Sequence, residues 1–134
     1  MAKAVVFWSG TGNTEAMAER VAQAASADLI RAADFTAARA ADYDAIAFGC
    51  PAMGDEVLEE CEFQPMYDSV KGVLSGKRVA LFGSYGWGDG QWMRAWEEDI
   101  LACGAQLVCG SIICPDAPDD NALEELDALA AALG

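Results

Sequence analysis

The chain has 134 residues, of which 22 are Asp or Glu, 8 are Lys or Arg and none is His, so its formal net charge at pH 7 is −14. This charge repels phosphate backbones and anionic lipid headgroups, which argues against nucleic acid and membrane surfaces as partners. Without His, the chain has neither an imidazole general base nor an imidazole metal ligand. A hydrophobic content of 54% supports a packed core and excludes a disordered acidic chain.

The five cysteines are an odd number without a Cys-x-x-Cys pair, which favours neither a zinc site nor a disulfide framework. Cys50, Cys103 and Cys109 lie among apolar residues and are expected to be small buried side chains. The apolar run 4–8 is far shorter than the roughly 20 residues that span a bilayer. We therefore expect one domain over residues 1–134, monomeric by default, in a reducing cytoplasm.

Short apolar runs alternate with segments of helical periodicity along the chain. Strands are expected at residues 4–8, 28–31, 45–49, 79–84 and 107–114. Helices are expected at residues 13–26, 36–41, 65–74, 91–102 and 119–133, and an acidic loop at 52–63. Five strands that are each followed by a helix predict an α/β fold, a parallel sheet with helices on both faces.

Three glycine- and hydroxyl-rich segments follow strands, at residues 9–14, 51–56 and 84–90. Ligands of such sheets bind beyond the carboxyl ends of the strands, so these segments are expected to converge. The first segment combines glycines and hydroxyls at the start of a helix and is suited to hold a phosphate by neutral donors alone. It has neither the Lys of a nucleotide-triphosphate loop nor the third Gly of a dinucleotide fold, and a hydroxyl-rich helix cap with a turn is the alternative.

The sequence Trp-Ser-Gly-Thr-Gly-Asn-Thr-Glu at residues 8–15 resembles the phosphate loop of flavodoxins, the small FMN-binding electron carriers. The segments 49–56 and 83–90 resemble the two flavin-flanking loops of short-chain, clostridial-type members. This likeness extends over essentially the whole chain. It implies the doubly wound flavodoxin-like fold, with a five-stranded parallel sheet of order 2-1-3-4-5. It also implies FMN as cofactor and low-potential one-electron transfer, between semiquinone and hydroquinone, as function.

The resemblance assigns the phosphate to the first loop and the flavin ring to the other two. Met53 and Trp87 would enclose the ring. The Gly54–Asp55 peptide would lie near flavin N5, and Glu56 near N3. Pro51 stands where some members have a serine that faces the phosphate, and it has neither N–H nor hydroxyl for that contact. The predicted cofactor-binding residues are Ser9, Gly10, Thr11, Gly12, Asn13, Thr14, Pro51, Ala52, Met53, Gly54, Asp55, Glu56, Ser84, Tyr85, Gly86, Trp87 and Gly88.

Other side chains near these loops have competing interpretations. Trp92 and Trp96, four residues apart in a helix, are expected to pack in the core, whereas Trp8 is ambiguous between core and cofactor contact. The acids that follow the third expected strand form either a solvated loop or a surface that steers basic redox partners. They are Asp55, Glu56, Glu59, Glu60 and Glu62. Residues 40–70 contain no Lys or Arg, so a second electron on the flavin is expected at low potential.

Three other functions compete with a carrier that has no catalytic residues: a reductase, a phospho-acceptor signalling domain and a phosphatase. An FMN-dependent NAD(P)H:quinone-type reductase needs room over the flavin ring, which Met53 and Trp87 would block. A phospho-acceptor signalling domain needs an Asp at the position of Cys50. A phosphatase nucleophile at Cys50 needs an Arg shortly after it, which the sequence lacks. The lack of a His, a Cys–base pair and a metal-ligand set favours the carrier.

Overall fold

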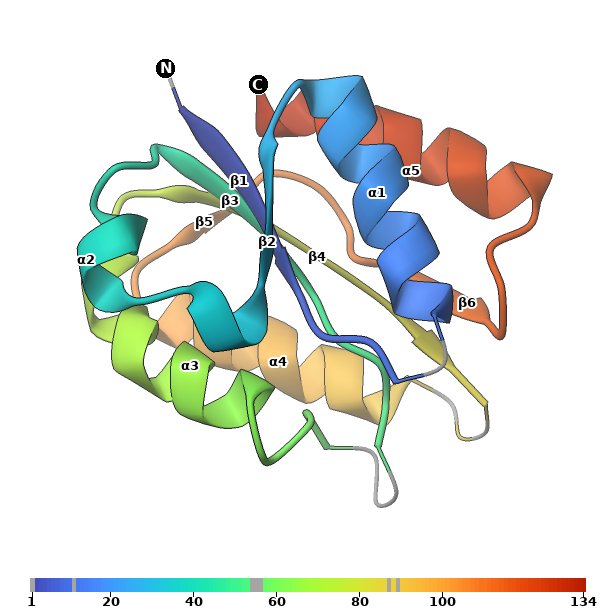
Figure 1. The fold of residues 1–134 in the computed structure, drawn as a ribbon, viewed down its shortest axis with the longest axis horizontal. Coiled ribbons are helices and arrows are strands. Elements are labelled where there is room, and N and C mark those ends of the chain that lie inside the picture. The colour runs from blue at the N-terminus through green and yellow to red at the C-terminus, as the bar shows by residue number, and fades with distance from the viewer. Residues whose placement is uncertain (1, 11, 54–56, 87, 89) are drawn as a thin grey trace.

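The computed structural model describes residues 2–10, 12–53, 57–86, 88 and 90–134, and their strands form one parallel sheet (Figure 1). The strand order is β2-β1-β3-β4-β5, with β6 also paired to β4, which confirms the predicted fold class. The strands are β1 (Lys3–Phe7), β2 (Asp28–Arg31), β3 (Ala45–Gly49), β4 (Arg78–Tyr85), β5 (Gln106–Leu107) and β6 (Ile112–Pro115). The helices are α1 (Asn13–Ala25), α2 (Ala37–Ala40), α3 (Phe63–Val70), α4 (Gln91–Ala102) and α5 (Asp120–Leu133), with 3-10 turns η1 (Ala32–Asp34) and η2 (Lys71–Val73).

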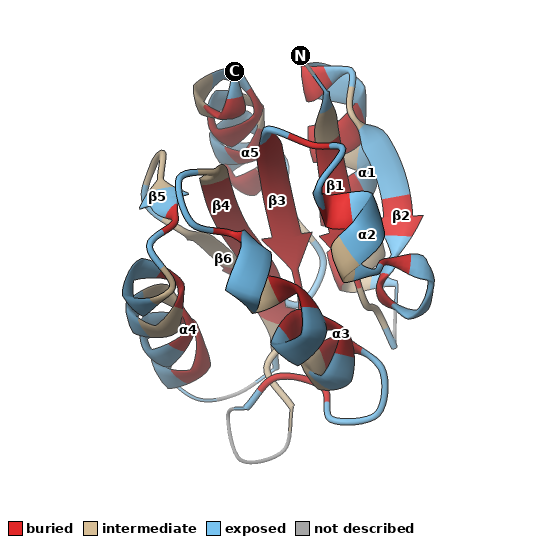
Figure 2. Ribbon diagram, turned by 90° about the vertical axis from the view of Figure 1, so that its left-hand side faces the viewer, coloured by how far each residue is buried: buried red, intermediate tan, exposed pale blue. Residues whose placement is uncertain are grey.

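The helices cover both faces of the sheet, so the central strands are buried on both sides (Figures 1 and 2). Alternate side chains of the strands enter two separate cores. Val6, Phe48 and Leu81 pack with the residues of α3 and α4. Val5 and Phe82 pack with those of α1 and α5. This two-sided burial explains why the central strands are near-continuous apolar runs.

Two elements differ from the sequence expectation. The expected last strand at residues 107–114 is broken into β5 and β6, which both pair with β4. Gly110 lies in the break, where it offers no side chain to pack, and Ser111 Oγ donates to Glu97 Oε2 of α4 at 2.6 Å. The helix expected at 65–74 begins two residues earlier, at Phe63, and its last turn is the 3-10 turn η2, which contains Gly72.

The burial of the tryptophan and cysteine side chains agrees only in part with the sequence expectation. Trp92 and Trp96 are 2% and 3% exposed, which confirms that they pack in the core. Cys50 is buried as expected, but Cys103 and Cys109 are only partly buried. Cys103 follows the last turn of α4 and Cys109 lies in the broken edge strand, so neither is fully covered. No helix in the described ranges combines the length and apolar character that crossing a bilayer requires.

Candidate functional site

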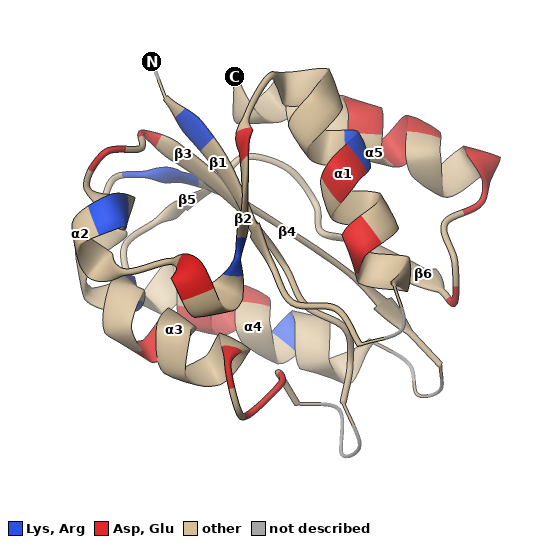
Figure 3. Ribbon diagram, viewed as in Figure 1, with Lys and Arg blue, Asp and Glu red and all other residues tan. Residues whose placement is uncertain are grey.

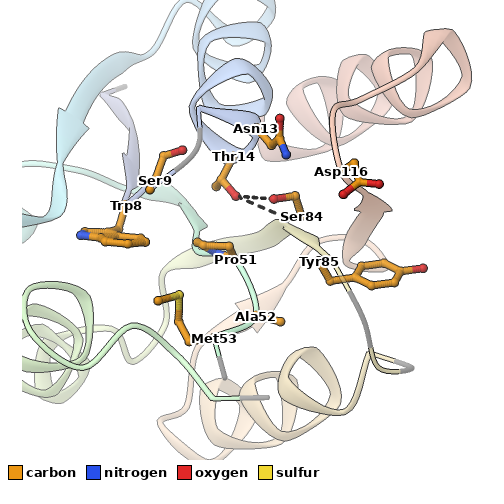
Figure 4. A pocket seen from close by; sticks show the side chains of 12 residues that line it. Trp8, Ser9, Asn13, Thr14, Pro51, Ala52, Met53, Ser84, Tyr85 and Asp116 are labelled. Carbon is orange, nitrogen blue, oxygen red and sulfur yellow. Dashed lines mark hydrogen bonds between the residues drawn. The ribbon is translucent and has the colours of Figure 1, made fainter. Parts of the chain in front are cut away.

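A cavity of about 230 Å³ lies at the carboxyl ends of the central strands (Figure 4). Its walls come from the turn after β1, the first turn of α1, the segment after β3, the end of β4 and the residue after β6. The described residues that line it are Trp8, Ser9, Gly10, Asn13, Thr14, Pro51, Ala52, Met53, Ser84, Tyr85, Gly86 and Asp116. The three loops identified in the sequence therefore meet at one site, as the parallel sheet predicts.

The start of α1 lies at this site, because Asn13 and Thr14 of its first turn line the cavity. Gly12 has a φ of 97°, a conformation that favours glycine, and its N–H donates to Ser9 Oγ at 3.0 Å. No side chain in the described part of the chain caps the start of α1. The N–H groups of the first turn, beginning at Asn13, are not used within the helix and carry the positive end of its dipole. This arrangement suits a bound phosphate.

Two buried hydroxyls form the floor of the cavity. Thr14 Oγ1 and Ser84 Oγ are 3.0 Å apart, and the Ser84 backbone N–H donates to Thr14 Oγ1 at 3.3 Å. The two residues are 1% and 4% exposed. They join the first turn of α1 to β4, and each hydroxyl has further capacity for a ligand oxygen. The pair therefore supplies neutral polar groups to an anion.

Backbone hydrogen bonds hold the segment after β3 against β4. Cys50 N–H donates to the Phe82 carbonyl at 3.2 Å, and Ala52 N–H donates to the Ser84 carbonyl at 3.1 Å. Met53 forms an isolated antiparallel bridge with Val57, with its N–H 3.0 Å from the Val57 carbonyl. The bridge joins the residues on either side of positions 54–56 and places Met53 in the cavity wall.

Glu59 anchors the continuation of this segment and is buried, not part of a solvated acidic loop. Its carboxylate accepts from the backbone N–H groups of Cys61, Glu62 and Phe63 at 2.7–2.8 Å. Burial raises the pKa of Glu59, but the three N–H donors outweigh that effect and hold it below its usual value. The interpretation of Glu59 as a surface acid is therefore wrong. The groups that bury it are backbone N–H donors of residues 61–63, and their direction cannot be read from the side chains in the sequence.

Trp8 joins the cavity to the same turn. It is half-buried in the cavity wall, and its indole Nε1–H donates to Glu62 Oε1 at 2.9 Å. Trp8 also packs against the core on the α3 and α4 side. Trp8 therefore belongs partly to the core and partly to the cavity wall. Glu62, expected in a solvated loop or on a partner-steering surface, accepts a hydrogen bond from Trp8.

The thiol of Cys50 is unsuited to nucleophilic chemistry. Cys50 is fully buried, and its Sγ accepts from the Glu59 backbone N–H at 3.4 Å. Burial raises the pKa of the Cys50 thiol to about 12, so it stays protonated at neutral pH. This environment argues against the phosphatase interpretation independently of the missing Arg.

Asp116 is a lining residue that the sequence analysis missed. It follows β6 with a φ of 57°, and its N–H donates to the Tyr85 carbonyl at 3.0 Å. The signal was available, because Asp116 stands just beyond the carboxyl end of the last strand. No Lys or Arg occurs among the described residues of the cavity wall, so the charge that the side chains bring to it is negative.

Most of the predicted cofactor residues within the described ranges meet in the cavity. Those that line it are Ser9, Gly10, Asn13, Thr14, Pro51, Ala52, Met53, Ser84, Tyr85 and Gly86. Gly12 shapes the first turn, and Gly88, with a φ of 94°, is exposed and lies outside the wall. The predictions for Thr11, Gly54, Asp55, Glu56 and Trp87 concern positions outside the described residues.

Comparison with known proteins identifies the same family along most of the chain. The flavodoxin family model matches residues 5–129. The flavodoxins of Clostridium beijerinckii and Megasphaera elsdenii are each 46% identical over 121 residues, which are 87% of this chain and 88% of each relative. The solution structure of two-electron reduced M. elsdenii flavodoxin superimposes with a TM-score of 0.88 at 41% identity, covering 96% of this chain and 98% of that one.

Oxidised flavodoxin 1 from Bacillus cereus has a TM-score of 0.87 at 25% identity, covering 99% of this chain and 97% of that one. These matches confirm the resemblance that the three loops indicated. They also confirm FMN as cofactor and electron transport as function, and they do not favour the reductase alternative. The chain belongs to the flavodoxin family, whose members are FMN-binding, low-potential electron carriers.

Proposed function

We propose that the cavity is the FMN site and that the chain forms one domain over residues 1–134. The phosphate is assigned to the loop of Ser9, Gly10, Thr11, Gly12, Asn13 and Thr14. The uncapped start of α1 carries this assignment, because its backbone N–H groups need an acceptor. The described wall residues include no Lys or Arg, so these N–H groups are the positive end that a phosphate would meet there. The Thr14–Ser84 hydroxyl pair adds donors. Pro51 contributes apolar surface only.

The flavin ring is assigned to the space between Met53 and Trp87. A thioether and an indole both favour contact with a flat aromatic system and exclude water from it. Gly54 and Asp55 are assigned to flavin N5, and Glu56 to N3. Gly54 lacks a Cβ, so its peptide can turn to offer either its N–H or its carbonyl. Bound FMN supplies the one-electron chemistry, and the chain sets its potential.

Charge explains why the second electron enters at low potential. Residues 40–70 contribute acids but no Lys or Arg, and Asp116 adds a carboxylate to the cavity wall. A further negative charge on the ring would therefore meet like charge and low dielectric, and both raise its free energy. We infer that the chain exchanges single electrons with its partners and catalyses no reaction of its own.

Purified protein titrated with FMN tests this function. We expect a yellow complex, quenched FMN emission and two separate one-electron steps during stepwise reduction, with negligible NADPH oxidation by the isolated protein. Rapid NADPH oxidation coupled to quinone reduction would establish the reductase instead. Failure to bind FMN would overturn the assignment of the cavity.

The acids on the loop that leads into α3 indicate basic-surfaced redox proteins as partners (Figure 3). Exposed Glu60 lies on this loop beside Glu62, and Asp55 and Glu56 share the segment. Such charges speed encounter with a basic partner, and salt weakens the effect. Electron transfer to a basic partner is therefore expected to slow as ionic strength rises.

We assign the protein to the cytoplasm as a monomer.

Thr14→Val is expected to raise the FMN dissociation constant about tenfold, because the nearly isosteric side chain removes one hydroxyl beside the phosphate and leaves Ser84 without its partner. Fluorescence titration measures the change. Riboflavin, which has no phosphate, is the control and should bind wild type and variant alike. Equal weakening for both ligands would place the effect of Thr14 in the fold instead.

Trp87→Ala is expected to weaken FMN binding by about 1–3 kcal/mol, the scale for losing an aromatic stack. Trp87→Phe keeps an aromatic ring and should recover most of the affinity. The same fluorescence titration measures both variants. Affinity that is unchanged in Trp87→Ala would remove Trp87 from the ring site.

A further inference from the structure

Glu62 lies at the start of α3, outside the cavity proposed to bind FMN, and its side chain contacts one wall of that cavity. Its carboxylate oxygen Oε1 accepts from Trp8 Nε1–H at 2.9 Å. Trp8 lines the proposed FMN cavity, whereas Glu62 does not. Glu62 instead lines a smaller cavity of about 160 Å³, and among the described residues the two cavities share Trp8 and Ser9. Glu62 therefore contacts the wall of the proposed FMN cavity through Trp8.

The side chain of Glu62 is available for this contact because another residue caps α3. Glu62 occupies the N-cap position of α3, but its side chain makes no capping hydrogen bond. The carboxylate of Glu59 takes that role and accepts from the backbone N–H of Glu62 at 2.7 Å. Arg31 also lines the smaller cavity, but it pairs with Glu15 at 3.2 Å. The backbone of Glu62 is thus held by Glu59, and its carboxylate by Trp8.

Trp8 connects this contact to the loop assigned to the phosphate. Its backbone N–H donates to the Gly49 carbonyl at 3.0 Å, which fixes the start of its side chain beside β3. A Cβ at Gly10 would lie 3.1 Å from Cη2 and 3.4 Å from Cζ3 of Trp8, so the far edge of the indole packs against the Gly10 backbone. Figure 4 shows the indole nitrogen at the opposite end, turned away from Thr14. One end of the ring is therefore held by Glu62, and the other supports Gly10.

We propose that Glu62 is a positioning residue for the phosphate of the cofactor, because its hydrogen bond holds the Trp8 ring against Gly10 and so fixes the phosphate loop. The inference rests on the proposed function, in which residues 9–14 bind the phosphate of FMN. Within this loop, Ser9 Oγ accepts from the Gly12 N–H. The Trp8 contact adds a tie to the turn before α3, outside the loop.

The charge of Glu62 predicts the opposite effect on FMN binding, which allows charge and position to be separated. Glu62 is an exposed carboxylate on a chain of net charge −14, and the FMN phosphate is an anion. If Glu62 acted through its charge alone, its loss would reduce repulsion and leave the FMN affinity unchanged or slightly higher. If it acts through Trp8, its loss lowers the affinity because the phosphate loop loses its support. The sign of the change distinguishes the two.

Titrations of the full chain with FMN and riboflavin test this role. Glu62→Ala is expected to raise the dissociation constant of FMN roughly fivefold, the scale of one hydrogen bond, and that of riboflavin, which has no phosphate, by less than about twofold. Glu62→Gln keeps an acceptor oxygen without the charge and should recover most of the FMN affinity. Glu60→Ala removes the same charge from the exposed position two residues away and should leave the FMN affinity unchanged or slightly higher.

The indole resonance of Trp8 gives a second measurement, which does not depend on FMN. In ¹⁵N-labelled protein the Trp8 Nε1–H resonance, identified by its loss in Trp8→Phe, should move upfield in Glu62→Ala and keep its position in Glu60→Ala. When Trp8→Phe has already removed the donor, adding Glu62→Ala should cause no further loss of FMN affinity.

The outcomes separate this role from the proposed function. If wild type binds FMN and Glu62→Ala binds it equally well or more tightly, or binds FMN and riboflavin with the same loss, Glu62 does not position the phosphate loop. If wild type binds no FMN, the proposed function fails and this inference fails with it, whatever the Trp8 resonance shows.

Discussion

Gly83→Ala is expected to lower the free energy of unfolding by about 3 kcal/mol, which corresponds to a fall in Tm of roughly 10 °C. Gly83 lies in β4 opposite the end of β3, where a Cβ would overlap the backbone carbonyl oxygen of Cys50 and come within 3.1 Å of its carbon. That carbonyl also accepts from Trp92 Nε1 at 3.2 Å. Relief therefore requires the strands to separate or the Trp92 hydrogen bond to break.

The effect of Gly83→Ala should extend to the cavity proposed to bind FMN, because Pro51 and Ser84 adjoin the strained contact and line that cavity. Gly72→Ala is the matched control, since a Cβ there meets no atom within 4 Å. It should leave stability unchanged or raise it by about 0.4–1 kcal/mol. Urea denaturation measures both variants. Equal stability of the two would show that the approach of Cys50 to Gly83 does not constrain the fold.

The site could be located from sequence because topology limits where parallel strands end. Glycines and hydroxyls at 9–14, 51–56 and 84–90 follow three buried strands, and the sheet brings those strand ends to one edge. The same argument covers Asp116, which also follows a strand, but a lone acid after a proline carries no local pattern. Local composition identifies loops that are rich in glycine and hydroxyl side chains, but it does not identify an isolated wall residue such as Asp116.

The environment of each acid could not be predicted. Glu59 and Glu60 are adjacent and chemically identical, yet one is buried and the other exposed. The difference depends on the backbone of residues 61–63, which turns its N–H groups onto one carboxylate. The broken last strand has a similar origin, because the Ser111–Glu97 hydrogen bond is a tertiary contact that no local periodicity reports.

Glu59→Gln is expected to lower the free energy of unfolding by about 2 kcal/mol at pH 7. The carboxylate accepts three backbone N–H groups, and hydrogen bonds to a buried charge are the strong ones. The Gln amide keeps one carbonyl oxygen as an acceptor. Its NH₂ group replaces the other oxygen and would face a backbone N–H, so two hydrogen-bond donors would point at each other. Since Glu59 lies between Met53 and α3, the variant should also loosen the segment that carries Met53. Glu60→Gln, its exposed neighbour, is the control and should change stability by no more than about 0.5 kcal/mol.

The pH dependence separates the charge of Glu59 from its shape. The pKa of Glu59 is lower in the folded protein than its usual value of 4.5, so the folded state binds fewer protons at this group than the unfolded state. Its contribution to stability is therefore fully present above pH 4.5 and is lost as the pH falls through the folded-state pKa. The stability difference between wild type and Glu59→Gln should be constant from pH 8 to pH 6 and shrink progressively below about pH 4.5. Urea denaturation of both proteins across this range measures it, and a difference that stays the same at low pH would mean that packing, not the ionised carboxylate, makes Glu59 stabilising.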